Sequence, residues 1–258
     1  MLDVSSARKA VRSSVPKFFV SPDAIQGGFL VLSGENAAHA KVLRLKSGDS
    51  VTVCDGDGCD YACTVSDVSP GQISLVVHSK SPSAAEPSVR CSVYMAYAKA
   101  DKLEHVIQKA TELGACEIVA FPSARCVSRP DEKSLAKKRE RWQKIAASAA
   151  EQSGRGQIPE VVTAESFACA VKRACESDLA LFPYENEQQL SLRAALGTAG
   201  YRSVSIMTGP EGGFTPDEVT LARDAGMQIC SLGPRILRCE TAPLCVLTAV
   251  LFAAGDLD

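Results

Sequence analysis

Two short loops in the C-terminal quarter of the chain combine glycines with charged side chains. They span residues 209–213 and 233–242. Glycine lets a backbone turn sharply and lets a ligand approach it closely. A carboxylate can accept a proton, and a guanidinium can stabilise negative charge that develops during a reaction. These loops therefore predict a ligand site with two carboxylates that can accept a proton, Glu211 and Glu240, and two guanidinium groups that can stabilise negative charge, those of Arg235 and Arg238.

Each loop also has a plainer explanation. A loop of either kind occurs as an ordinary tight turn between a strand and a helix. Glu211 suits a helix amino terminus, where the helix dipole stabilises a negative side chain. Arg235 and Arg238 suit loop anchoring through hydrogen bonds to carbonyl oxygens. We favour the ligand site because two such loops follow consecutive predicted strands and would open into one crevice.

Both loops follow a predicted strand and precede a predicted helix. Residues 203–207 form a short β-type run before the first loop. After that loop, Thr215 and Glu218 match a capping box, and Pro216 suits the first helical position. Residues 228–232 form the predicted strand before the second loop, and an apolar helix follows it to the C-terminus. This order places both loops at the carboxyl ends of strands, where open α/β sheets bind ligands.

Strands and helices also alternate upstream of these loops, from about residue 88. Such alternation is typical of a parallel α/β sheet. A glycine that follows an apolar-faced helix is typical of a helix carboxyl terminus. The predicted strands cover residues 92–96, 117–121 and 179–182, and the predicted helices run from Asp101 to Gly114 and around Trp142 to Gly154.

The N-terminal part of the chain has a different pattern, of short strands and turns. The segment from Asp55 to Gly58 has the chemistry of a hairpin turn between two β-type runs. We therefore expect a small β-barrel-like domain over residues 17–80. The segment 79–87 has the composition of a linker. An α/β domain is expected over residues 88–258, and residues 1–16 are expected to form a mobile tail.

The composition limits the possible cofactors and partners. The formal net charge is -2, so a nucleic-acid partner would need a local basic patch. Residues 125–144 supply one candidate, although most such runs are solvated helix faces. The 11 cysteines show no metal-ligand spacing, so we expect reduced thiols and no metal. Reduced thiols are typical of a cytoplasmic protein, which is the location that we expect. No apolar run is long enough to span a bilayer, so we expect no membrane partner.

Several segments carry a family resemblance. The sequences GPEGGFTPDEV, from Gly209, and LGPRILRCETA, from Leu232, resemble the RsmE family of 16S rRNA (uracil-N3)-methyltransferases in the SPOUT superfamily. Residues 42–49, 108–114 and 149–155 extend the resemblance over nearly the whole chain after the predicted tail. The resemblance implies an enzyme that uses S-adenosylmethionine to methylate N3 of a specific uridine in the 16S rRNA of the small ribosomal subunit.

The resemblance also implies an architecture. It implies an α/β fold with a SPOUT-type parallel sheet and a C-terminal trefoil knot, in which the last helix lies under the loops that hold the cofactor. The small β domain in front of this sheet would be PUA-like and would help to bind RNA. The family further implies a homodimer, formed through the C-terminal domain, that acts on 16S rRNA or on the small ribosomal subunit.

The resemblance places S-adenosylmethionine among three loops. Apolar side chains would cover the adenine ring, and main-chain groups would bind its edges. The implied cofactor residues are Pro183, Tyr184, Glu185, Thr208, Gly209, Pro210, Glu211, Gly212, Gly213, Leu232, Gly233, Ile236, Leu237, Arg238 and Thr241. Methyl transfer to N3 also needs a proton acceptor and a cation near a uracil oxygen, for which the candidates are Glu211, Glu240, Arg235 and Arg238.

Phosphate contacts to RNA are expected from both domains. The candidates are Lys17, Arg44 and Lys46 in the N-terminal domain, and Arg125, Arg129 and Arg155 nearer the target base. Arg44 is the leading candidate because it lies in a segment that matches the family. One departure from the family pattern is Cys239, which stands where threonine is usual and so lacks the hydroxyl donor.

Two other functions stay open from the sequence alone. A SPOUT methyltransferase could act on another RNA or on a ribose 2′-hydroxyl. A non-catalytic RNA-binding or ribosome-assembly protein could keep the same fold, although such a protein needs no adenine pocket. Binding of S-adenosylmethionine separates this last alternative from the enzymes.

Overall fold

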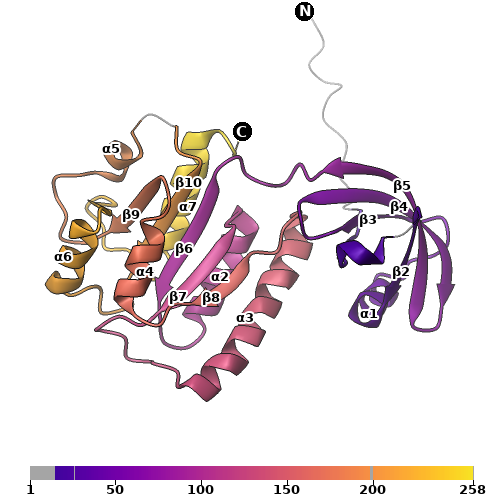
Figure 1. The fold of residues 1–258 in the computed structure, drawn as a ribbon, viewed down its shortest axis with the longest axis horizontal. Helices are drawn as coiled ribbons and strands as arrows, with labels where there is room; N and C mark the ends of the chain where they lie inside the picture. The colour runs from indigo at the N-terminus through magenta and orange to yellow at the C-terminus, as the bar shows by residue number, and fades with distance from the viewer. Residues whose placement is uncertain (1–14, 26, 198–199, 258) are drawn as a thin grey trace, which may run out of the picture. The chain divides into compact units, whose positions relative to one another are not determined.

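The structure is a computed structural model that describes residues 15–25, 27–197 and 200–257. The chain divides between Ala84 and Ala85 into two compact units, and each unit has its own sheet (Figure 1). The mobile tail expected from the sequence falls mainly on residues 1–14, which lie outside the described residues.

The N-terminal unit is a five-stranded sheet with the strand order β1-β3-β4-β5-β2. β1 runs parallel to β3, and the other pairs are antiparallel. Successive side chains of a strand face opposite ways, and the inward set builds a core that contains Phe18, Val53 and Leu75. The elements are β1 (Lys17–Phe19), the 3-10 turn η1 (Pro22–Ala24), β2 (Phe29–Ser33), α1 (Gly34–Val42), β3 (Ser50–Cys54), β4 (Cys59–Ser69) and β5 (Gln72–Pro82).

Two features of this unit differ from the expectation. Residues 79–82 are strand rather than linker, because the pairing of β5 with β4 continues as far as Pro82. The helix α1 has no counterpart among the predicted elements. Its only buried residues are Ala37 and Ala40, so no apolar stripe of large side chains indicates a helix there.

The C-terminal unit is built on six parallel strands in the order β11-β9-β10-β6-β7-β8. This arrangement confirms the parallel α/β sheet that the alternation of strands and helices predicts. Its inner strands are almost continuously apolar, because both faces of a parallel sheet are covered. The strands are β6 (Arg90–Ala96), β7 (Glu117–Phe121), β8 (Glu160–Thr163), β9 (Leu179–Pro183), β10 (Ser203–Thr208) and β11 (Gln228–Cys230).

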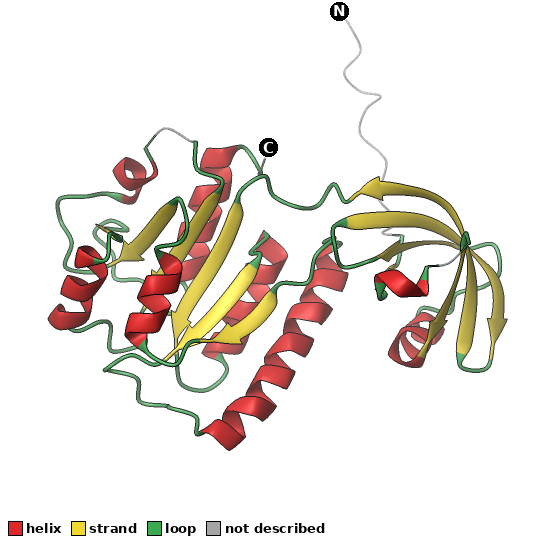
Figure 2. Ribbon diagram, viewed as in Figure 1, coloured by secondary structure: helices red, strands yellow, loops and turns green. Residues whose placement is uncertain are grey.

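Helices cover both faces of this sheet (Figure 2). One core contains Trp142 and Leu251 and lies between the sheet and the helices α2, α3 and α7. The other contains Phe182 and Val219 and lies between the opposite face and the helices α4 and α6. No helix within the described ranges is long and apolar enough to cross a membrane. The helices are α2 (Lys102–Leu113), α3 (Glu132–Ser153), α4 (Phe167–Ala174), α5 (Leu192–Leu196), α6 (Pro216–Asp224) and α7 (Ala242–Ala254).

Three helix ends follow the predicted chemistry, whereas the Asp101 side chain makes no capping hydrogen bond at the start of α2. α2 ends at Gly114 and α3 ends at Gly154, and both glycines have the left-handed backbone that other residues adopt only at a cost. At α6, the Thr215 hydroxyl accepts from the Glu218 N–H, and the Glu218 carboxylate accepts from the Thr215 N–H. The capping box is therefore confirmed, with Pro216 in the first turn.

A buried ion pair ties the end of α3 to the start of the C-terminal unit. Arg155 directly follows the Gly154 cap, and its guanidinium pairs with the carboxylate of Glu86. The same guanidinium donates to the carbonyl oxygens of Thr111 and Ala115. Only 2% of Arg155 is exposed. Arg155 is therefore not available for the RNA contact expected from the sequence.

Loss of this guanidinium would leave Glu86 as a largely buried carboxylate without its cation, so we predict that Arg155→Met lowers the free energy of unfolding by about 3 to 5 kcal/mol. Urea unfolding followed by fluorescence reports on the C-terminal unit alone, because Trp142 is the chain's single tryptophan. The matched control is Arg141→Met, whose exposed pair with Glu104 should contribute about 1 kcal/mol or less. Equal losses in the two variants would contradict the prediction.

Candidate functional site

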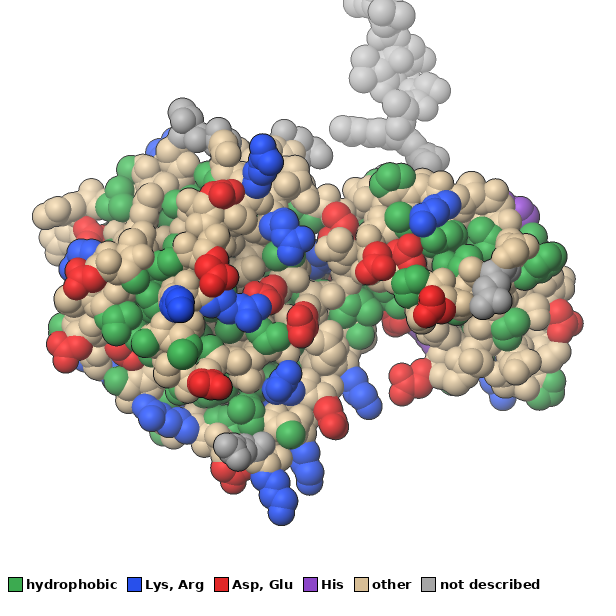
Figure 3. All heavy atoms as spheres, in the orientation of Figure 1, with side chains coloured by type: hydrophobic (Ala, Val, Ile, Leu, Met, Phe, Trp, Pro, Cys, Tyr) green, Lys and Arg blue, Asp and Glu red, His purple; other side chains and the backbone are tan. Residues whose placement is uncertain are grey.

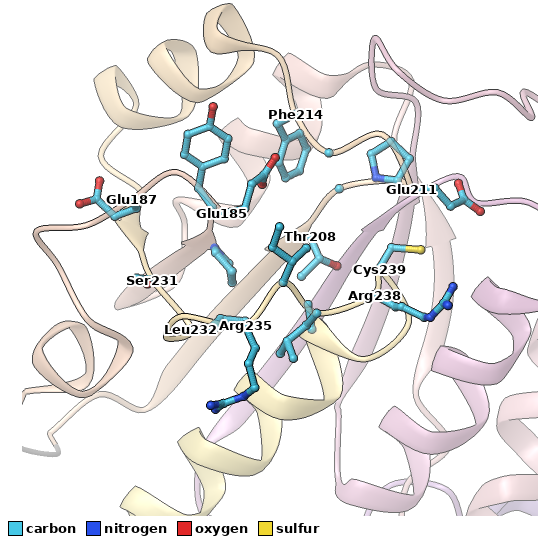
Figure 4. Close-up of a pocket in the computed structure, with 18 of the residues that line it drawn as sticks. Glu185, Glu187, Thr208, Glu211, Phe214, Ser231, Leu232, Arg235, Arg238 and Cys239 are labelled. Carbon is cyan, nitrogen blue, oxygen red and sulfur yellow. The ribbon is translucent and has the colours of Figure 1, made fainter.

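A cavity of about 810 Å³ opens at the carboxyl edge of the six-stranded sheet. Three loops line it, and they follow the neighbouring strands β9, β10 and β11. Their lining residues fall within 183–188, 208–214 and 231–239, and Figure 4 shows labelled side chains of all three loops around one space. Lys102 at the start of α2 and Ala242 at the start of α7 complete the lining.

The strand order brings these three loops together. β9 pairs in parallel with β10 on one side and with β11 on the other, so the three carboxyl ends lie at one edge. Backbone hydrogen bonds continue beyond the strands. The Tyr184 N–H donates to the Cys230 carbonyl at 2.9 Å, and the Ser231 N–H donates to the Leu190 carbonyl at 2.8 Å. The loop after β9 is therefore held against the end of β11.

The loop after β10 needs its glycines for steric reasons within the protein itself. Gly213 has a φ of +65°, in the left-handed region, and a Cβ there would lie 2.7 Å from Oε1 of Glu185. A Cβ on Gly209 would lie 3.2 Å from the ring of Phe214. A larger residue at either position would therefore move the wall of the cavity.

The loop between β7 and α3 supports the same turn from one side. A Cβ on Gly212 would lie 3.2 Å from the Cβ of Arg125, and the Arg125 guanidinium donates to the Gly212 carbonyl at 2.9 Å. The Ala124 N–H donates to the Glu218 carboxylate at 2.8 Å. Arg129 donates to carbonyl oxygens of its own loop. Both arginines are exposed, but each also has a structural role that the sequence does not reveal.

The loop after β11 carries two exposed arginines that point in different directions. Gly233 has a φ of +95°, which lets the chain turn soon after the strand. Figure 4 shows Arg238 on the side of the cavity that holds Glu211 and Cys239, whereas Arg235 extends away from them. Within the described part of the chain, neither guanidinium has a hydrogen bond or an ion pair. Loop anchoring, the alternative left open by the sequence, is therefore not the role of either guanidinium in this structure.

Lys102 links the two glycine-containing loops through their carboxylates. Its Nζ lies 3.3 Å from Oε1 of Glu211 and 3.5 Å from Oε2 of Glu240. The Lys99 N–H donates to the same Glu211 oxygen at 2.9 Å. The thiol of Cys239 donates to Oε2 of Glu240 at 3.2 Å. Cys239 thus still supplies a donor, although it replaces the threonine usual in the family.

These contacts shift the pKa values of the two carboxyls and of the thiol. Burial acts to raise the pKa of Glu211, but the hydrogen bond from the Lys99 N–H and the charge of Lys102 outweigh it, so the pKa is lowered. Burial acts on Glu240 in the same way and is likewise outweighed, by hydrogen bonds that include the thiol and by the charge of Lys102. Burial raises the pKa of the Cys239 thiol to about 12, which keeps the thiol protonated as a donor. Both carboxylates are therefore ionised at neutral pH and can accept a proton.

Most of the site residues predicted from the sequence meet at this cavity. Every expected cofactor residue except Thr241 lines it. Thr241 is exposed at the amino-terminal end of α7. Of the residues expected to act in catalysis, Glu240 is the one that does not line the cavity, and it reaches the edge through its contact with Lys102.

The sequence pattern does not single out Lys102, Glu187 or Phe214, which also line the cavity. The Phe214 ring packs on Phe182, with 4.3 Å between ring centroids, and so belongs to the core as well as to the site. Lys102 lies a short turn after β6. This position just after a strand is the one feature of the sequence that could have indicated Lys102 as a site residue. The pairing of β6 with β10, which brings Lys102 to the site, is not visible in the sequence.

The residues expected to contact RNA have different surroundings in the structure. Arg44 and Lys46 are exposed, and Arg44 has a φ of 57°, in the left-handed region. Lys17 is buried, and its ammonium lies 2.7 Å from the carboxylate of Asp60. Lys17, like Arg155, is therefore not available for the contact that the sequence predicts. Both cations are occupied by partners distant in the sequence.

The cysteines form neither disulfides nor a metal site in the described residues. All 11 cysteines lie in the described ranges and none forms a disulfide, and no group of three potential ligands that could hold a metal ion is found there. Burial raises the pKa of the Cys91 and Cys230 thiols to about 12. These thiols pack as small apolar side chains within the core.

Two family models match the chain. The model described as an RNA methyltransferase domain matches residues 85–251. The model described as an RNA methyltransferase PUA domain matches residues 32–77. The two matches fall on the C-terminal and N-terminal units, respectively.

Named relatives resemble the chain over most of its length. The ribosomal RNA small subunit methyltransferase E of Bacillus subtilis is 37% identical over 227 residues, which are 86% of this chain and 89% of the relative. The crystal structure of a ribosomal RNA small subunit methyltransferase E from Neisseria gonorrhoeae, bound to S-adenosyl methionine, has a TM-score of 0.81. It is 28% identical and covers 91% of this chain and 96% of its own.

A Legionella pneumophila protein whose structure holds the bound cofactor SAM has a TM-score of 0.80 and 28% identity, over 93% of this chain and 98% of its own. The RNA methyltransferase domain matches more than half of the chain, and the Bacillus relative is similar over nearly its full length. This chain therefore belongs to the ribosomal RNA small subunit methyltransferase E family.

Proposed function

We propose that this protein transfers a methyl group from S-adenosylmethionine to N3 of a uridine in the 16S rRNA of the small ribosomal subunit. One observation carries the proposal: a single cavity brings together two glycine-containing turns and an exposed arginine, with two ionised carboxylates at its edge. Membership of the family supports the substrate class, because its named members are ribosomal RNA small subunit methyltransferases.

The cavity fits S-adenosylmethionine in size and in chemistry. Its volume lies within the range of small-molecule sites. Leu232, Leu237 and Phe214 supply apolar surface for an adenine ring, and the turns at Gly209 and Gly233 bring main-chain groups to the lining. The Neisseria and Legionella relatives hold this cofactor in their structures. The residues that we propose to hold it are those of the three lining loops, within 183–185, 208–213 and 232–238.

When bound, S-adenosylmethionine supplies a methyl group on a positively charged sulfur. The protein must hold uracil N3 close to that group and in line, and such positioning contributes much of the rate. N3 carries a proton, which must leave as the N–C bond forms. Glu211 or Glu240 accepts this proton, and Arg238 stabilises the negative charge that grows on a uracil carbonyl oxygen.

Exposed cations are proposed to guide the RNA to this site. N3 lies on the pairing edge of uracil, so the target base must be unpaired and turned out of its stack. Figure 3 shows Lys and Arg side chains gathered where Figure 1 places the amino-terminal end of α3. The proposed phosphate contacts are the exposed residues Arg44 and Lys46 in the N-terminal unit, and Arg125, Arg129, Lys133, Lys137 and Lys138 in the C-terminal unit.

A trefoil knot, a homodimer and a cytoplasmic location belong to the same proposal. The knot is supported by the path of the chain, because residues 231–241 leave β11 at the edge of the sheet and lead to α7, which packs on β10 and β6. The homodimer is supported by apolar surface on α7, where Phe252 is 70% exposed. The cytoplasm is where the proposed substrate is assembled.

A methylation assay with purified protein tests the proposal. Small ribosomal subunits from a strain that lacks this gene are incubated with S-adenosylmethionine that carries a labelled methyl group. Nuclease digestion and mass spectrometry should then find the label in 3-methyluridine. Label in a ribose-methylated nucleoside, or no transfer to any RNA despite cofactor binding, would contradict it.

Cofactor binding should depend on the backbone at Gly213. Gly213→Val places a side chain at a left-handed φ and against Glu185, so we predict a Kd for S-adenosylmethionine that is about tenfold higher or more. Isothermal titration calorimetry measures it. The control is Gly200→Val, because a Cβ there meets nothing within 4 Å. Wild-type affinity in Gly213→Val would remove this loop from the proposed cofactor site.

Arg238 should act on turnover more than on cofactor affinity. Lysine keeps the charge but loses the planar fork, so Arg238→Lys should lower kcat by about tenfold to a hundredfold and change the cofactor Kd by less than about threefold. Steady-state kinetics and calorimetry on this variant separate the two effects. Arg193→Lys, an exposed arginine of α5, is the control. Weaker cofactor binding with turnover retained would assign Arg238 to the shape of the loop.

RNA affinity should depend on salt through Arg44. Arg44→Asn removes one phosphate contact and keeps a residue that tolerates the left-handed backbone. The slope of log Kd against log salt concentration should therefore decrease by about one, with cofactor affinity unchanged. Filter binding of 16S rRNA over a salt series measures it, with Lys172→Asn on α4 as the control. An unchanged slope in Arg44→Asn would exclude Arg44 from the RNA surface.

A further inference from the structure

Lys102 is the charged side chain, among the described residues, that contacts both candidate proton acceptors. It extends from the first turn of α2, whereas Glu211 and Glu240 come from the loops after β10 and β11. Oxygens of both carboxylates lie within 3.5 Å of its Nζ. Its side chain is 26% exposed, so the ammonium forms part of the cavity wall rather than extending freely into solvent.

The backbone before α2 is shaped for this contact. Ala100 has a φ of 55°, in the left-handed region, which residues other than glycine adopt at a cost. This turn directs both the Lys99 N–H and the Lys102 ammonium to the same oxygen of Glu211. A strained residue beside a candidate site indicates that the surrounding structure holds this geometry against a local cost.

Two carboxylates that share one cation are coupled to each other. Without the cation, each negative charge would disfavour the ionised form of the other, and one carboxyl would retain its proton to higher pH. The titratable groups that face one another here are Lys102 of α2, Glu211 of the β10 loop, and Cys239 and Glu240 of the β11 loop. The thiol stays protonated and adds no charge, so the ammonium is the positive charge among these four groups that offsets the two carboxylates.

We propose that Lys102 is a positioning residue that keeps Glu211 and Glu240 ionised together, so that one of them is ready to receive the N3 proton. This inference rests on the proposed function and describes the acceptor before any RNA binds. Lys102 acts through the carboxylates rather than on the reacting atoms. Its loss should therefore change the pH dependence of the reaction, whereas a purely structural contact would lower the rate equally at every pH.

The direction in which pH affects the activity of a variant without Lys102 follows from the pKa values of the two carboxyls. Burial acts to raise the pKa of each, but hydrogen bonds and the charge of Lys102 lower it, so the acceptor is ionised well below neutral pH. Lys102→Met removes the cation and raises the pKa of at least one carboxyl. A rise of one unit lowers the ionised fraction about tenfold at pH values below both pKa values. Activity is then lost first on the acid side and recovers as the pH rises.

Carbon-13 NMR of the glutamate carboxyls tests this without cofactor or RNA, so its failure is distinct from failure of the proposed function. Glu211→Gln and Glu240→Gln assign the two signals. In the wild-type protein both should titrate below the ordinary glutamate pKa, and in Lys102→Met at least one should titrate about one unit higher or more. Lys102→Arg should keep the wild-type values. Lys109→Met, which removes a lysine paired with Glu112 on the same helix, is the matched control. Unchanged signals in Lys102→Met would overturn the proposal.

The pH profile of turnover then identifies the acceptor. At saturating cofactor, the turnover of Lys102→Met relative to the wild type should fall on the acid side, by about tenfold at pH values below both pKa values of the acceptor, and should recover to the wild-type value at about pH 9. Adding Glu211→Gln or Glu240→Gln to this variant removes the like charge. The double variant that keeps the acceptor should regain activity on the acid side, and the one that loses it should stay inactive. Equal losses on the acid side and at about pH 9, with no rescue by either double variant, would overturn the proposal.

Discussion

The parallel pairing of β9 between β10 and β11 is the constraint on which the site depends. It places three loops at one edge of the sheet, and each loop alone would be an ordinary strand-to-helix turn. Contacts between loops then fix the shape of the cavity. Arg125 supports the turn at Gly212 from the neighbouring β7–α3 loop, and the Tyr184 N–H holds the β9 loop to the end of β11. The packing of Phe214 on Phe182 joins this wall to the core beneath it.

Charge at the site is arranged so that the protein can both accept a proton and stabilise negative charge. Lys102 is shared between Glu211 and Glu240, which leaves both carboxylates ionised and one negative charge in excess. The Arg238 guanidinium lies outside this network and has no protein partner in the described residues, so it is available for the substrate oxygen that we propose it contacts. Charge is also distributed unevenly over the whole molecule. Its net charge is slightly negative, yet exposed cations gather at one end of α3, and local charge governs attraction of RNA.

The sequence predicts well what depends on neighbouring residues. The capping box at Thr215 and the helix end at Gly114 rest on chemistry within a few positions, and both are confirmed. The two glycine-containing loops of the proposed cofactor site are also local motifs, and the family resemblance adds the third loop. Pairing across the fold is what the sequence does not contain. Lys17 and Arg155 have the pattern of surface cations, but each is buried against a distant carboxylate. Lys102 is missed for the same reason, because its partners lie in loops much later in the chain.

The central claim is that this cavity serves methylation of uridine N3 in the small-subunit rRNA. Mass-spectrometric mapping of 16S rRNA from a strain that lacks the gene tests it most directly. The account predicts that one 3-methyluridine disappears, that the wild-type gene restores it, and that a gene with both Glu211→Gln and Glu240→Gln does not. A strain that keeps all of its 3-methyluridine, or that loses a ribose methylation instead, would contradict the account.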